Sequence, residues 1–380
     1  MSDPAPVAVI GGGVIGAAVV YTLARRDIPA VLLEAEDALA LGASGANSGI
    51  LCTGFDAVPG ALETALIVRS APLRDAVIDE LAVPVLRCGA LLAPRDRAEA
   101  RTIASLAENA QRNGVATVLS ADGTLEVPGE AVTDPVAYTL ALAGAARAAG
   151  VEIRTAEAVI AIEAAGEHLS VASAHGASLR CRAIVNCAGL HADDVAALAG
   201  DTHFTIFPRK GEFFVFDPPG GVPVDGILLP VPDRDTKGVL VFPTVDGQVV
   251  AGPTARDQVD KDDWTVSEDA RAQVLSKATT LLPALADAQP VASYAGLRPA
   301  GRGCNYVIER SRALAGVIHV AAIRSTGLSA SLGIAEHVVA MLARDGVRLG
   351  PDRPLAPGPV AATGGRWWAR AAAHREGDGG

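Results

Sequence analysis

Three glycines near the start of the chain and an acidic residue after them have the spacing of a dinucleotide-binding turn. Gly11, Gly13 and Gly16 follow the apolar run 7–10, and Glu34 closes a second apolar run. The first glycine permits a tight turn, the second lets the backbone approach a pyrophosphate, and the third lets a helix pack on the sheet. The positive helix end favours phosphate, and Glu34 can accept hydrogen bonds from a ribose 2′-OH. The pattern predicts a dinucleotide site that disfavours NADP and leaves FAD and NAD open.

Alternating strand and helix patterns position this turn. Amphipathic periodicity predicts helices at 62–81, 96–113, 135–149 and 267–282, and a last strand and helix at 317–343. From 204 to 252 the pattern changes to period two, which predicts an antiparallel sheet. We therefore expect an α/β fold with a Rossmann-like cofactor domain and an interleaved α+β substrate domain built on an antiparallel sheet.

The changes of pattern also give domain boundaries. We expect a discontinuous cofactor domain at 1–80, 150–203 and 300–346, and a substrate domain at 81–149 and 204–299. The Gly-, Pro- and Ala-rich tail at 347–380 is expected to be partly mobile. Its Trp367 and Trp368 either contact a membrane surface or a partner, or pack on the protein itself.

Composition excludes several classes of partner. The net charge of −11 argues against nucleic acid but not against a small anionic substrate. No apolar run is long enough for a membrane span, and the first strand begins too early for a signal peptide, so we expect a cytoplasmic protein. Five cysteines without CxxC spacing indicate no metal site.

Further motifs follow the glycine turn in a fixed order, at 46–50, 54–56, 186–190, 209–212, 244–247, 252–254, 295–299 and 325–329. With them the chain resembles the D-amino-acid-oxidase-like superfamily of FAD-dependent oxidoreductases. Within it, the chain is most similar to the branch of L-2-hydroxyglutarate oxidase and anaerobic-type glycerol-3-phosphate dehydrogenase. The resemblance implies FAD as the cofactor. We expect it to be noncovalent, because Cys304 is not placed like the covalent flavin cysteine of sarcosine-oxidase-like relatives.

The glycine turn and the resemblance together give a set of cofactor-binding residues. The resemblance implies that Ser44, Asn47 and Ser48 lie along the pyrophosphate and flavin, and that Val159 meets the adenine. The last helix begins at 327–329, and a helix N-terminus beside the flavin would stabilise the negative charge of reduced flavin. The full expected set is Gly11, Gly13, Val14, Ile15, Gly16, Glu34, Ala35, Ser44, Asn47, Ser48, Gly49, Val159, Ala188, Gly189, Arg298, Gly327, Leu328 and Ser329.

Five residues are candidates for catalytic work. Arg298 can hold a carboxylate bidentately and orient its Cα–H towards flavin N5, although an interdomain salt bridge is the alternative. Lys210 either lies over the flavin or is a surface lysine, and Arg324 either binds substrate or is structural. Tyr294 is a further candidate. Cys52 stands where the branch usually carries His, and an unperturbed thiol is a poor base at pH 7.

These residues predict an enzyme that moves a hydride from the Cα of a small carboxylate onto flavin N5. Oxygen, a quinone or another carrier then takes the electrons. The leading substrate class is a 2-hydroxy acid, because the segment 62–65 lacks the basic residues that the branch tends to carry for larger anions. An amino or imino acid is the alternative, since the lone pair of a neutral amine can expel hydride with less help from a base. A flavin-binding accessory subunit without chemistry of its own is a third possibility, and the sequence does not indicate the oligomeric state.

Overall fold

The computed structural model describes residues 5–176, 178–232, 238–359 and 365–376. One end of the molecule is built on a six-stranded sheet in the order β20-β21-β13-β1-β2-β9, in which all pairings are parallel except that of β20 with β21. Its strands, in chain order, are β1 (Val7–Ile10), β2 (Ala30–Leu33), β9 (Glu152–Arg154), β13 (Ala183–Asn186), β20 (Val307–Arg310) and β21 (Val317–Ala321). The central strand β1 is buried at every residue, which explains its unbroken apolar run.

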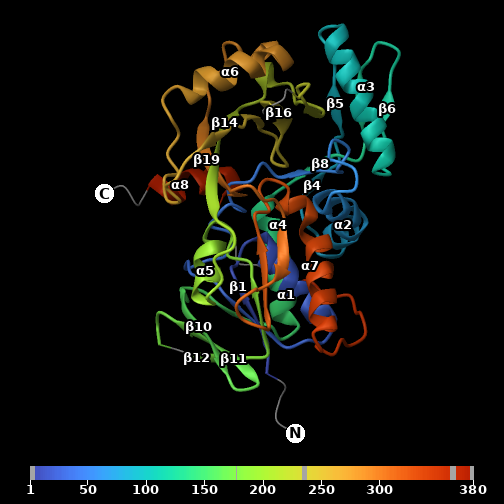
Figure 1. The fold of residues 1–380 in the computed structure, drawn as a ribbon. Coiled ribbons are helices and arrows are strands. Elements are labelled where there is room, and N and C mark those ends of the chain that lie inside the picture. The colour runs from blue at the N-terminus through green and yellow to red at the C-terminus, as the bar shows by residue number, and fades with distance from the viewer. Residues whose placement is uncertain (1–4, 177, 233–237, 360–364, 377–380) are drawn as a thin grey trace.

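Four helices share one apolar core with this sheet: α1 (Val14–Arg25), α2 (Leu62–Glu80), α4 (Pro135–Ala148) and α7 (Gly327–Arg344). In Figure 1, α1, α4 and α7 lie close together in the lower half of the molecule. Helix α1 packs against both α4 and α7. Since α4 shares the core of the cofactor layer, we place the domain boundary before it rather than at residue 149.

Smaller sheets flank this layer. The strands β10 (Val159–Ala165), β11 (His168–Ser173) and β12 (Ser178–Cys181) form an antiparallel sheet, and α5 (Ala192–Leu198) follows β13. The strands β3 (Ile50–Leu51), β4 (Val85–Leu86) and β8 (Ala131–Thr133) form another, with β8 between β3 and β4. Residues of β3 and β8 enter the cores of both halves of the molecule, so this small sheet joins them.

The other half of the molecule contains the expected antiparallel sheet. Its longest strands are β14 (Ile206–Phe216) and β19 (Ala292–Gly301), paired from Ile206↔Gly301 to Val215↔Ala292. The remaining strands are β5 (Ala90–Leu92), β6 (Val118–Leu119), β7 (Leu125–Val127), β15 (Ile227–Leu228), β16 (Leu240–Pro243), β17 (Val249–Gly252) and β18 (Arg256–Asp257). Helices α3 (Arg97–Arg112) and α6 (Ala270–Leu281) lie at this end of the molecule (Figure 1). The prediction of an α/β fold with a Rossmann-like cofactor domain and an antiparallel substrate domain is confirmed.

The segment expected to be a partly mobile tail contains a helix, α8 (Trp367–Glu376). Trp367 and Trp368 are 3% and 6% exposed, and both belong to the core of the antiparallel half. The option that these rings meet a membrane or a partner is corrected: burial of large aromatic area inside the protein holds them. No helix among the described residues is long and apolar enough to cross a membrane, and a cytoplasmic location stays a prediction.

Candidate active site

Two cavities meet between the halves of the molecule. We call the one lined by Gly11 and Gly13 the glycine-turn cavity, and it has a volume of about 660 Å³. The one lined by Arg298 is the arginine cavity, with a volume of about 480 Å³. Their linings share three residues, Ala43, Asn47 and Arg324. A ligand in the first cavity can therefore reach a ligand in the second.

The glycine-turn cavity contains the features of a pyrophosphate site. Gly13 caps α1 without a side-chain hydrogen bond, and the first turn carries no acid, so nothing opposes the positive end of the helix. A Cβ on Gly11 would lie 2.4 Å from the carbonyl oxygen of Cys187, so the turn requires glycine. Ser44 Oγ accepts a hydrogen bond from the Val14 N–H at 2.9 Å, which places a hydroxyl beside the same helix end.

Glu34 lies at the edge of this cavity and is fixed by backbone donors. Its Oε2 accepts from the Gly12 N–H at 2.5 Å, and its Oε1 accepts from the Glu36 N–H at 2.9 Å. Burial raises the pKa of Glu34, and the N–H groups of Glu36 and Gly12 oppose that rise. A carboxylate has about four acceptor sites, so it can still accept from a ribose hydroxyl.

Most of the expected cofactor residues line the glycine-turn cavity: Gly11, Gly13, Val14, Ile15, Glu34, Ala35, Ser44, Asn47, Val159, Ala188, Gly189, Gly327 and Leu328. Ser48 and Arg298 line the arginine cavity instead. Three others have packing roles and line neither cavity. A Cβ on Gly16 would lie 1.9 Å from the Gly11 carbonyl oxygen, and one on Gly49 would lie 2.3 Å from that of Thr133. Ser329 is buried, and its Oγ accepts from the Cys52 N–H at 2.8 Å.

Arg298 is a buried cation held by main-chain carbonyl groups. Its Nε donates to the Arg209 carbonyl at 2.9 Å, and its Nη2 donates to those of Lys210 and Thr254 at 2.9 and 2.8 Å. Arg209 and Arg298 are directly opposite on β14 and β19, which brings the guanidinium to this place. The expected bidentate grip is therefore corrected, because two of its three nitrogens already donate to the protein. Nη1 alone has no partner among the described residues.

Positive charge collects around Arg298. Burial lowers the pKa of Arg298 to about 10, and the neighbouring charges of Arg209 and Arg324 lower it further. Arg209 pairs with Asp257 at 2.8 Å, whereas no acid among the described residues is bonded to Arg298. Arg324 has a left-handed backbone with φ of +53° and lines both cavities. Such a buried, unpaired cation is costly for the fold unless an anion binds beside it.

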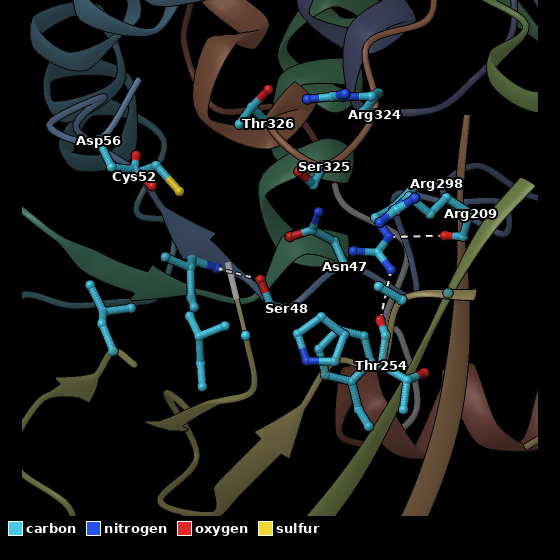
Figure 2. Close-up of a pocket in the computed structure, with 18 of the residues that line it drawn as sticks. Asn47, Ser48, Cys52, Asp56, Arg209, Thr254, Arg298, Arg324, Ser325 and Thr326 are labelled. Atoms are coloured by element: carbon cyan, nitrogen blue, oxygen red, sulfur yellow. Dashed lines mark hydrogen bonds between the residues drawn. The ribbon is translucent and has the colours of Figure 1, made fainter. Parts of the chain in front are cut away.

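Cys52 and Asp56 lie across the arginine cavity from Arg298 and Arg209 (Figure 2). The main chain of Cys52 is fixed on both sides. Its N–H donates to Ser329 Oγ, and its carbonyl accepts from Arg74 Nη1 at 3.2 Å. The cysteine is thus held rigidly at the cavity wall. Most of the remaining wall is apolar and includes Phe55, Leu92, Leu106, Phe213, Leu229, Leu240 and Phe242.

Two expected catalytic residues do not reach either cavity. Lys210 Nζ donates to Asp263 Oδ2 at 2.8 Å and to the Thr265 carbonyl at 3.1 Å. Successive side chains of a strand point to opposite faces, so Lys210 turns away from the cavity that its neighbour Arg209 lines. Tyr294 is 2% exposed and stacked on Phe213 with ring centroids 4.9 Å apart. Both candidates are replaced by structural roles.

Glu130 lines the arginine cavity and was not among the expected residues. It follows Pro128 and Gly129, a pair that typically marks an exposed turn, and no periodicity points to burial. The structure nevertheless leaves Glu130 only 2% exposed. Sequence offered one weak signal, an acid directly before the apolar run that forms β8.

A family model described as FAD dependent oxidoreductase matches residues 6–341. The chain belongs to this family. It is 30% identical over 352 residues to a glycerol 3-phosphate dehydrogenase of Caloramator mitchellensis, covering 88% of this chain and 73% of that protein. It is 29% identical over 286 residues to a mitochondrial L-2-hydroxyglutarate dehydrogenase of Nematostella vectensis, covering 67% of this chain and 63% of that protein.

A solved structure extends the comparison to the fold. The L-alpha-glycerophosphate oxidase of Mycoplasma pneumoniae with FAD bound superposes with a TM-score of 0.84 and 25% identity, covering 93% of this chain and 97% of that one. The protein is therefore an FAD-dependent oxidoreductase. Its own residues fit the cofactor, since the glycines of the turn leave space for a pyrophosphate beside Ser44 and the uncapped end of α1. Bound FAD supplies a two-electron acceptor at the junction of the cavities.

Proposed function

We propose that the protein oxidises a small carboxylate at Cα, with a 2-hydroxy acid as the leading substrate class. One observation carries the proposal: Arg298 is a buried cation with no acid bonded to it among the described residues. Its free Nη1 can donate a charge-assisted hydrogen bond to a carboxylate. Arg324, at the junction of the two cavities, adds positive charge beside the same place.

The other walls of the arginine cavity limit what the rest of the substrate can be. Its apolar lining favours a small or apolar remainder over a second anionic group. Arg298 holds one end of the substrate, and Asn47 and Arg324 lie where the two cavities join. This arrangement supports presentation of the Cα–H to the flavin by fixing the carboxylate on one side. The electron acceptor, whether oxygen, a quinone or another carrier, stays a prediction.

An amino or imino acid is the second candidate, favoured by Cys52 on the wall opposite Arg298. No histidine lines the arginine cavity among the described residues. A hydroxyl needs a base to take its proton, whereas a neutral amine begins with a lone pair that can expel hydride. The same carboxylate contact with Arg298 serves both substrate classes.

Anaerobic flavin reduction tests the proposal. Purified protein loaded with FAD is mixed with a panel of 2-hydroxy acids, amino acids and glycerol 3-phosphate, and bleaching of the flavin absorbance is followed. We expect fast reduction by one or more 2-hydroxy acids. Reduction by amino acids alone would establish the second candidate, and reduction by glycerol 3-phosphate alone would contradict a carboxylate substrate. A flavin that no compound reduces would indicate a binding subunit without this chemistry.

A further inference from the structure

A buried carboxylate lines the arginine cavity on the same side as Cys52. The ladder between β3 and β8 ends with the pair Leu51↔Ala131, and Cys52 and Glu130 are the residues that directly adjoin this pair. Both line the arginine cavity. Glu130 therefore lies next to the position at which a family resemblance places the substrate-facing histidine.

The hydrogen bonds of Glu130 are unequal between its two oxygens. Oε1 accepts from the Thr53 N–H at 2.7 Å and from the Thr53 hydroxyl at 2.8 Å. No described residue donates to Oε2, and none forms a salt bridge with this carboxylate. The nearby Arg74 donates Nη1 to the carbonyl groups of Cys52 and Ser329 instead. Thr53 thus fixes the carboxylate at one oxygen and leaves the other for a group in the cavity.

We propose that Glu130 takes the proton that the substrate hydroxyl loses when Cα is oxidised. The inference rests on the function proposed above. The Cα–H bond breaks and its electron pair passes as hydride to oxidised FAD. The O–H bond breaks, its proton passes to Glu130 Oε2, and a C=O bond forms. Glu130 then supplies the base that the Cys52 thiol does not, which removes the main objection to a 2-hydroxy acid.

The surroundings of Glu130 suit a proton acceptor at neutral pH. Burial raises the pKa of Glu130 to about 7, and the hydrogen bonds from Thr53 oppose that rise. The titratable and charged groups that face it are Asp56 on the loop after β3, Arg74 on α2, Cys52 after β3 and Cys88 between β4 and β5. Asp56 raises this pKa and Arg74 lowers it. Since only the ionised form accepts a proton, flavin reduction should rise with pH through about 7.

The test compares the pH profiles of flavin reduction in four FAD-loaded proteins. These are the wild type, Glu130→Gln, Thr53→Val and the control Glu126→Gln, which changes an exposed acid on β7. With the best 2-hydroxy acid of the panel, Glu130→Gln should be about 10²- to 10⁴-fold slower and lose the rise through pH 7. Thr53→Val keeps the carboxylate but removes one hydrogen bond to it. Its midpoint should move to higher pH by about one pH unit.

A second readout does not depend on turnover. Infrared spectra of the wild type between pH 5.5 and 8.5 should show a protonated carboxyl band that disappears near pH 7, and Glu130→Gln should lack it. An unchanged pH profile in Glu130→Gln, or an unmoved midpoint in Thr53→Val, overturns the inference while leaving the proposed function standing. If no 2-hydroxy acid reduces the wild-type flavin, the leading form of the proposed function fails and the inference fails with it.

Discussion

Replacing Arg298 by alanine should weaken substrate binding far more than it weakens the fold. One charge-assisted hydrogen bond, from Nη1, remains for a substrate carboxylate. Its loss costs about 1.5–3 kcal/mol. That range corresponds to a rise of roughly 10- to 150-fold in the substrate concentration that gives half-maximal flavin reduction.

The effect of this change on stability is the difference between two terms. Alanine removes three hydrogen bonds to carbonyl groups, each worth about 1 kcal/mol. It also removes a buried charge whose pKa is lowered to about 10, which corresponds to roughly 3 kcal/mol of unfavourable burial. The terms nearly cancel, so the free energy of unfolding should change by no more than about 2 kcal/mol.

The assay for Arg298→Ala combines anaerobic flavin reduction over a range of substrate concentrations with urea denaturation of the same preparations. Arg298→Lys should recover part of the loss, because an ammonium restores the charge without the planar fork. Arg312→Ala, which removes an exposed arginine, is the matched control and should behave like the wild type. An unchanged half-saturating concentration in Arg298→Ala would refute the assignment and make Arg324 the first choice for the carboxylate anchor.

Three further changes test other parts of the structure. Cys52→Ser should alter the rate of flavin reduction by less than about tenfold, because a protonated thiol supplies little of the effect of a base; a hundredfold loss with full flavin content would show that Cys52 acts directly. Glu34→Ala should lower the FAD content after dialysis, measured from flavin released by heat, and an undiminished content would remove Glu34 from the cofactor site. Trp367→Ala should lower the free energy of unfolding in urea by about 3–5 kcal/mol, and an unmoved midpoint would contradict the burial of this ring.

Local rules were sufficient for the glycine turn. The apolar run before Gly11, the helix after it and the second strand before Glu34 are determined by neighbours in the sequence, and the structure contains them with nearly the expected bounds. The period-two pattern after residue 204 likewise predicted the antiparallel sheet. In both cases the signal lies within one element, so no knowledge of distant contacts is needed.

The arginine cavity depended on contacts that a local pattern does not contain. The direction of Lys210 depends on which face of β14 lines the cavity, and this is set by pairing with β19 about 90 residues later. The partners of Arg298 are main-chain carbonyl groups, which are the same for every sequence. Glu130 is buried because β3 and α2 cover a turn that looks exposed by composition. The burial of Trp367 likewise requires the wall formed by Phe213 and Tyr294.

The lining of the glycine-turn cavity sets a timetable for cofactor loading during synthesis. Gly11 is among the first residues to leave the ribosome, whereas Gly327 and Leu328, on the same cavity, emerge 317 residues after it or later. At about 5–20 residues per second this interval lasts roughly 15–60 s. A nascent chain shorter than this presents the phosphate turn without the helix end that completes the lining. Flavin capture should therefore be a late event, and expression at limiting riboflavin should yield full-length apoprotein rather than chains arrested midway.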